Sequence, residues 1–220
     1  MIRFPRWTLA LAALLAAAPA AAQAQMARAD GDRRPAAAAR DTGLIVSSVE
    51  AAIARPAPRY ENFSLIVDLS DRMLYVLSGD DVVRQYPVAI GEEGYDTPDG
   101  SFRISRMIWN PDWTPPPSEW AKDKKYEAPG SPGNPMGRVK MFFRDPDFYI
   151  HGTGLTSSLG RARSHGCVRM RNIDVVELAR LVMVNGGEPR DAEWYQQTLA
   201  ERETMRTVTL RRPVPVRVRA

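Results

Sequence analysis

The chain has few of the residues that build covalent or metal-bound scaffolds. Its 220 residues include one cysteine and two histidines. A lone cysteine has no partner within the chain, which excludes an intrachain disulfide framework. The charge is also nearly balanced, with 30 basic and 26 acidic residues. Composition therefore gives no support for a nucleic-acid-binding protein, and we expect no nucleic-acid partner.

What remains is typical of a globular protein. Hydrophobic residues make up 44% of the chain and charged residues 25%, so a core can form. The length suggests one domain with tails, and we find neither an internal repeat nor a second domain. The 18 prolines are many for this length, and much of that proline falls in segments that resemble linkers or long loops.

Residues 1–24 have the three parts of a secretory signal peptide. Arg3 and Arg6 form the positive start, an Ala- and Leu-rich run follows, and Ala22-Gln23-Ala24 offers a cleavage site. The apolar run is too short for a membrane span, so we expect none after cleavage. The alternative is an uncleaved anchor helix. Cleavage leaves 28 basic and 26 acidic residues. Export to the periplasm or cell envelope makes an unpaired thiol unusual, because exported proteins mostly pair their cysteines.

Residues 25–60 predict a flexible linker, with a short helix near residues 44–54, and residues 61–220 predict the folded domain. Hydrophobic alternation and turn residues in that domain predict a mainly β fold with a few helices. The expected strands are residues 64–69, 73–77, 82–90, 101–105, 139–143 and 148–150, with a long excursion at residues 108–139 that includes Trp109. The tryptophans of the excursion argue against plain disorder.

Helical spacing follows Asp174, and Asp174 with Glu177 is a candidate capping box. Residues 185–187, Asn-Gly-Gly, are expected to end this helix, and a second helix is predicted at residues 191–203. Residues 207–210 and 214–218 predict a closing hairpin or an edge strand, because Pro213 and Pro215 limit pairing.

The histidines and the cysteine fall within seventeen residues, at His151, His165 and Cys167. A thiol acts as a nucleophile when a base is nearby, and an imidazole can also return the proton to a leaving amine. His151 ends a predicted strand, which is a rigid platform for a base. His165 lies two residues from Cys167, where contact with the thiol and a purely loop-orienting role both stay open.

The neighbouring residues fit the same chemistry. Gly166 permits close backbone approach, and the amides of Gly166 and Cys167 are candidates for an oxyanion hole. Arg169 suits a carboxylate or a solvated surface role. A zinc site of two histidines and the cysteine is the competing interpretation, but a fourth ligand at familiar spacing is missing from the motif. A buried, inert cysteine is the other alternative.

Two motifs, His151-Gly152-Thr153 and Ser164-His165-Gly166-Cys167-Val168-Arg169-Met170, closely resemble the signature of the L,D-transpeptidase (YkuD-type) family. The resemblance covers about residues 62–218. It includes Thr97-Pro98-Asp99-Gly100, the loop residues 110–116 and 134–137, and the C-terminal residues 210–216.

The resemblance implies a β-sandwich or barrel around a catalytic cleft and an enzyme of cell wall biogenesis and cell shape. Such enzymes act on peptidoglycan stem peptides. Their cysteine attacks the carbonyl of the diamino-acid residue, and the resulting thioester passes to an amine acceptor, which is a stem peptide or a protein lysine. A hydrolase of the same bonds and a non-catalytic wall-binding protein are the alternatives.

By position in the motifs, Cys167 matches the nucleophile and His151 the general base, with the carbonyl of Gly152 as its orienting group. Ser164, His165 and Gly166 match the surrounding substrate and oxyanion loop. Arg169 matches a motif position that holds substrate carboxylate. The resemblance implies neither a metal nor an organic cofactor. Relatives with a separate peptidoglycan-binding module differ from this chain, in which we see no such module.

Overall fold

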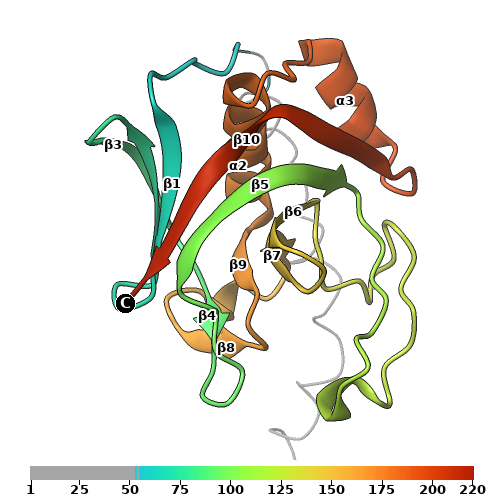
Figure 1. Cartoon of the computed structure of the whole chain (residues 1–220). Helices are drawn as coiled ribbons and strands as arrows, with labels where there is room; N and C mark the ends of the chain where they lie inside the picture. Colours follow the sequence, from blue (N-terminus) through green and yellow to red (C-terminus); the bar gives the residue numbers. More distant parts are fainter. Residues whose placement is uncertain (1–52, 54) are drawn as a thin grey trace, which may run out of the picture. The chain divides into compact units, whose positions relative to one another are not determined.

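The computed structural model describes residue 53 and residues 55–220 (Figure 1). The predicted signal peptide lies outside the described residues, as does most of the predicted linker with its helix near residues 44–54. Within the described part of the chain, no helix has both the length and the hydropathy of a transmembrane span.

The described residues form a mainly β fold, as predicted. In chain order the elements are β1 (Phe63–Asp68), β2 (Met73–Ser78), β3 (Asp81–Pro87), β4 (Ile90–Gly91), β5 (Gly100–Trp109), the 3-10 helix η2 (Glu119–Ala121), β6 (Val139–Arg144), β7 (Phe148–Thr153), the 3-10 helix η3 (Thr156–Ser158), β8 (Ala162–Ser164), β9 (Val168–Arg171), α2 (Asn172–Asn185), α3 (Ala192–Ala200) and β10 (Arg206–Arg219).

One sheet of eight strands carries the fold, in the order β3-β2-β1-β10-β5-β6-β7-β9, and it curls into a nearly closed barrel (Figure 1). Helix α2 packs against β6, β7, β9 and β10. Strands β4 and β8 form a separate two-stranded parallel sheet. Because β9 runs directly into α2, the chain segment that holds the cysteine motif is fixed at its C-terminal end by a buried helix.

The core follows from the alternation of apolar residues along the strands. In β10, Val214, Val216 and Val218 are buried while the residues between them are exposed. In the middle of the sheet, Met141 and Ile150 are neighbours on β6 and β7 and are fully buried. Burial of each such side chain contributes about 1.5–3 kcal/mol. One face of these strands therefore stabilises the core, and the other face is available for other contacts.

The prediction for the C-terminal strand was wrong. Strand β10 is neither a hairpin nor an edge, because it lies between β1, to which it is parallel, and β5, to which it is antiparallel. Its register shifts between Thr209 and Val214, so Pro213 falls in the break rather than in the ladder. A bulge of this kind tolerates a residue without an N–H group, which allows proline inside a central strand.

The predicted capping box was also wrong. Helix α2 begins at Asn172, and the Asp174 carboxylate accepts hydrogen bonds of 2.7 and 2.8 Å from the Arg171 guanidinium instead of capping the helix. The helix ends before Gly186, as predicted. Helix α3 is capped by Asp191, whose side chain accepts from the amide of Trp194 at 2.8 Å.

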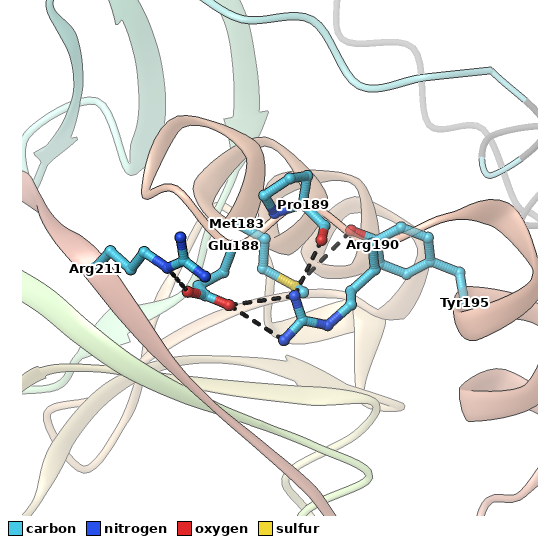
Figure 2. A network of polar contacts seen from close by, with 6 residues as sticks. All are labelled: Met183, Glu188, Pro189, Arg190, Tyr195 and Arg211. Carbon is cyan, nitrogen blue, oxygen red and sulfur yellow. Dashed lines mark hydrogen bonds and ion pairs between the residues drawn. The ribbon is translucent and has the colours of Figure 1, made fainter.

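Glu188 ties the end of α2 to the central strand. Its carboxylate accepts from Arg211 Nε on β10 at 2.8 Å and from both terminal nitrogens of Arg190 at 3.2 Å. Figure 2 shows both guanidinium groups at the carboxylate of Glu188, that of Arg211 from β10 and that of Arg190 from the same turn as Glu188. Charge-assisted bonds of this geometry are stronger than neutral ones, so the turn between α2 and α3 is held against β10.

The excursion begins later than expected. Trp109 ends β5 with no exposed surface and packs edge-on against Trp194, so it belongs to the core. The chain between β5 and β6 contains η2 and a β-bridge between Trp113 and Glu127. The side chain of Asn134 donates to the carbonyls of residues 111 and 128, at 2.8 and 3.0 Å. These bonds give the excursion a defined path.

Candidate active site

The pairing of two parallel strands brings the two sequence motifs together. In β7 and β9, Ile150 lies opposite Val168 and His151 lies opposite Arg169. Cys167 directly precedes β9, two residues before Arg169. Because His151 and Arg169 are paired, their side chains share one face of the sheet. The interactions of the Cys167 thiol with Tyr149 and Arg169 place it on that face. The opposite face is the core, with Ile150 and Val168 fully buried.

His151 is buried, with 2% of its surface exposed, and its ring is oriented by its own strand. Nδ1 lies 2.8 Å from the carbonyl oxygen of Gly152, which is the contact implied by the family resemblance. A carbonyl oxygen only accepts, so Nδ1 carries the proton and Nε2 offers a lone pair. Burial lowers the pKa of His151 to about 3, helped by the charges of Arg169 and Lys140 and opposed by the backbone of Gly152 and Met136. The imidazole is therefore neutral at neutral pH.

Cys167 is a free, partly exposed cysteine whose thiol donates to the carbonyl of Asp147 at 3.3 Å. Burial raises the pKa of Cys167 to about 11. The backbone and hydroxyl of Tyr149 oppose this rise by hydrogen bonding to the sulfur, and the charges of Arg169 and Lys140 add to their effect. At rest, Cys167 is therefore a thiol and His151 a neutral imidazole, rather than a thiolate and an imidazolium.

Tyr149 and Lys140 are site residues that sequence reasoning missed. Tyr149 lies two residues before His151 on β7, and its ring is 5.6 Å from the imidazole. Lys140 lies opposite His151 on β6. The period of two along β7 was a usable signal for Tyr149. The position of Lys140 depends on the register between β6 and β7, which the sequence does not specify.

The loop before Cys167 is shaped by Ser164 and Gly166. Ser164 is fully buried, and its hydroxyl donates to the Cys167 carbonyl at 2.5 Å and accepts from the Gly166 amide at 3.2 Å. Gly166 has φ +98°, and a Cβ there would lie 2.8 Å from the ring of Phe148. The loop thus requires glycine. Because the Gly166 amide is directed at Ser164, the Cys167 amide is left as the candidate oxyanion donor.

Thr97, 69 residues earlier than Gly166 in the sequence, also holds this loop in place. Its hydroxyl donates to the Gly166 carbonyl and accepts from the Gly91 amide, both at 2.9 Å. The backbone of Arg169 exchanges two hydrogen bonds with Ala89, at 2.9 and 3.0 Å. The Thr-Pro-Asp-Gly turn therefore has a positional role in the site that its turn chemistry alone did not predict.

His165 faces the excursion. Its ring stacks on Trp120 with centroids 3.9 Å apart, meets the edge of Tyr95 at 4.8 Å, and has Nε2 3.8 Å from Glu92. Burial lowers the pKa of His165, and the charge of Glu92 opposes the shift. Of the two roles left open by the sequence, these contacts favour orientation of the loop.

Arg169 is anchored but keeps part of its guanidinium unused by these contacts. Its Nη1 donates to the carbonyl of Arg163 at 2.9 Å. Burial lowers the pKa of Arg169, and the charges of Cys167 and Glu92 oppose this. Across residues 53 and 55–220, no three His, Cys, Asp or Glu side chains converge as metal ligands.

Comparison with known proteins identifies the same segment as a unit. Residues 62–215 match the family profile described as YkuD, the L,D-transpeptidase catalytic domain. Over 120 residues the chain is 33% identical to the L,D-transpeptidase homologue YkuD of Bacillus licheniformis, covering 54% of this chain and 60% of that protein. Over 123 residues it is 34% identical to YbiS of Escherichia coli, covering 51% of this chain and 39% of that protein. The aligned region thus spans less than two thirds of each of these relatives.

The chain also resembles two solved structures. An L,D-transpeptidase from Mycobacterium smegmatis superposes with a TM-score of 0.46 at 16% identity, covering 72% of this chain and 59% of the other. The catalytic domain of the Enterococcus faecium L,D-transpeptidase gives 0.46 at 15% identity, covering 74% of this chain and all of that domain.

Proposed function

Because the chain belongs to the YkuD family of L,D-transpeptidase catalytic domains, we propose that it is a peptidoglycan L,D-transpeptidase with Cys167 as nucleophile. Its donor is a stem tetrapeptide, and its acceptor is an amine of a second stem peptide or of a protein lysine. The predicted signal peptide supports action in the cell envelope. The observation that carries the proposal is the strand pairing that puts Cys167, His151 and Arg169 on one face, with the His151 ring held by Gly152.

Acylation begins when the Cys167 sulfur attacks the carbonyl carbon of the diamino-acid residue. The thiol proton passes to Nε2 of His151, which has the free lone pair because Nδ1 is bonded to Gly152. The thiol faces the Asp147 carbonyl at rest, so this step requires rotation about the Cys167 side chain. The Cys167 amide stabilises the oxyanion of the tetrahedral intermediate.

Collapse of the intermediate breaks the peptide bond to the terminal D-residue. His151 returns its proton to the leaving amine, and Cys167 is left as a thioester. The acceptor amine then attacks the thioester carbonyl, gives a proton to His151, and releases the Cys167 thiol. The neutral imidazole suits this cycle because it accepts and returns one proton in each half-reaction.

The test is incubation of the purified protein with isolated peptidoglycan, followed by analysis of the muropeptides. The proposal predicts new crosslinks between diamino-acid residues or attached protein, both absent with Cys167→Ala. Loss of the terminal D-residue without any transfer product would instead identify the hydrolase. An unchanged muropeptide pattern would favour the wall-binding alternative.

A further inference from the structure

A row of three polar side chains crosses the strands that carry the site. Lys140 on β6 lies opposite His151 on β7, which in turn lies opposite Arg169 on β9. Neighbouring strands are roughly 4.8 Å apart, so Lys140 and Arg169 flank His151 with backbones separated by roughly 10 Å. Cys167 lies on the same face, two residues before Arg169.

Arg106, Lys140 and Arg169 have different surroundings. Arg106 lies over the ring of Phe142 and forms an ion pair with Asp145, while Arg169 donates to the Arg163 carbonyl. Lys140 instead has its Nζ 5.3 Å from the ring centroids of both Phe142 and Tyr149. None of the ion pairs formed within the described part of the chain involves Lys140.

Lys140 is consequently a half-buried ammonium without a contacting carboxylate. Burial lowers the pKa of Lys140, while the charges of Asp112 and Cys167 oppose that shift. A partly desolvated cation is stabilised by contact with an anion. The rings of Phe142 and Tyr149 carry no charge that could neutralise the ammonium, so a bound ligand can supply the anion. The influence of Lys140 and Cys167 on each other's ionisation places the ammonium within electrostatic range of the nucleophile.

We propose that Lys140 forms a carboxylate-binding subsite for the terminal α-carboxylate of the donor stem peptide, on the D-residue that leaves. This assignment rests on the proposed function. The leaving amine takes its proton from His151, and its carboxylate carbon is two bonds away, about 2.5 Å from the nitrogen. The carboxylate therefore lies beside His151, between Lys140 on β6 and Arg169 on β9. Arg169 is anchored to the Arg163 carbonyl, which leaves Lys140 as the cation free to meet the carboxylate. The flexible stem of lysine suits this contact.

The subsite also selects where the donor ends. A stem peptide that continues past the D-residue has a neutral amide in place of the carboxylate. Such a donor leaves the Lys140 ammonium without an anion, and binding loses a charge-assisted contact. A donor that ends one residue after the attacked carbonyl satisfies it. Lys140 thus restricts the enzyme to stems whose chain stops at the leaving residue.

The test uses two synthetic tetrapeptide donors that differ only at the C-terminus, a free acid in one and a primary amide in the other. The kcat/KM for release of the terminal residue or its amide is measured for wild type, Lys140→Met, Lys140→Arg and Lys125→Met. Lys125 is an exposed lysine of the excursion and provides the matched control.

Wild type should favour the acid by about 10- to 100-fold, the range of a hydrogen bond to a charged group. Lys140→Met should lose that preference by slowing the acid donor by about 10- to 100-fold more than the amide donor. Any loss shared by both donors reflects the Lys140 charge, which lowers the pKa of Cys167. Lys140→Arg should keep most of the preference, and Lys125→Met should match wild type.

An equal loss on both donors in Lys140→Met would overturn the assignment, because it would show an effect on the nucleophile or on folding. A wild type that does not distinguish the donors would overturn it as well. A wild type that forms no thioester with either donor or with a carbapenem would overturn the proposed function itself, and with it the subsite. Retained thioester formation without carboxylate preference rejects the subsite alone.

Discussion

The imidazole of His165 stacks flat on the indole of Trp120, with ring centroids 3.9 Å apart and planes 3° apart. The contact joins the loop that holds Cys167 to the excursion between β5 and β6. Trp113 extends the stack, with its ring 6.3 Å from Trp120. The excursion is therefore held against the cysteine motif, where it can exclude water from the proposed thioester.

Replacing Trp120 should increase hydrolysis of the proposed thioester. In Trp120→Ala the stack on His165 is lost, so the thioester should be hydrolysed more and transferred less. The measurement is the ratio of transfer to hydrolysis products with one donor and one amine acceptor, which should fall by several-fold. Tyr126→Ala, at an exposed residue of the same excursion, is the control. An unchanged ratio in Trp120→Ala would rule out water exclusion by this contact.

The buried His151 should make the fold sensitive to acid. Its pKa is about 3 in the folded state against 6.5 as the ordinary value, so the unfolded chain binds the proton first as pH falls. Stability from this group is complete above pH 6.5 and is lost as the pH falls from 6.5 toward 3. At pH 5 the loss should reach about 2 kcal/mol, from 1.36 kcal/mol per pH unit. Urea unfolding between pH 5 and 7.5 measures it.

His151→Gln should flatten that pH dependence, whereas His165→Gln should largely keep it. Since His165 is only partly buried and is balanced by Glu92, its contribution is smaller. Identical slopes for wild type and His151→Gln would show that other groups cause the acid sensitivity.

Tyr149 should assist the nucleophile. Its hydroxyl and backbone oppose the rise in the pKa of Cys167 to about 11. Tyr149→Phe removes the hydroxyl and should raise this pKa by about 0.7, which corresponds to the loss of one neutral hydrogen bond. Thioester formation at neutral pH should slow by several-fold. The rate of alkylation by iodoacetamide between pH 7 and 12 reports the thiol directly, because Cys167 is the chain's one cysteine. Tyr126→Phe is the control, and a thiol profile unchanged by Tyr149→Phe would contradict the hydrogen bond.

Substitution of Gly166 should cost more folding stability than its positive φ alone would cause. Gly166→Ala places a residue at φ +98° and a Cβ 2.8 Å from Phe148. Gly160→Ala is the matched control, since Gly160 has φ +74° with open space around it. We expect Gly160→Ala to cost about 1 kcal/mol and Gly166→Ala about 2–3 kcal/mol in urea unfolding, with thioester formation impaired in the second alone. An equal loss of stability in the two variants would show that the Phe148 ring moves aside without an energetic penalty.

Sequence periodicity predicted most strands, because alternating burial leaves a signal within a few residues. It failed for β10, where Pro213 indicated an edge but lies in a register break of a central strand. It failed at Asp174, because the guanidinium of Arg171, three residues earlier in the chain, binds the carboxylate that the capping pattern assigned to the helix end. For β10 the local rule was overridden by long-range strand pairing, and for Asp174 by a competing ion pair within one turn of the chain.

The candidate site divides in the same way. Cys167 and His151 were predicted because rare residue types cluster in the chain. Lys140 and Thr97 were missed, because the first depends on the β6–β7 register and the second on a contact 69 residues away in sequence, between Thr97 and Gly166. Residues that support a nucleophile through long-range pairing leave no pattern in a single sequence.

The central claim is that Cys167 forms a thioester with a stem tetrapeptide. Intact-protein mass spectrometry after mixing with that donor tests it most directly. We predict a mass increase equal to the acyl tripeptide in wild type, release of the terminal D-residue, no adduct in Cys167→Ala, and formation about 100- to 10,000-fold slower in His151→Ala. An adduct that persists in Cys167→Ala, or wild-type protein that never gains the acyl mass, would contradict the account.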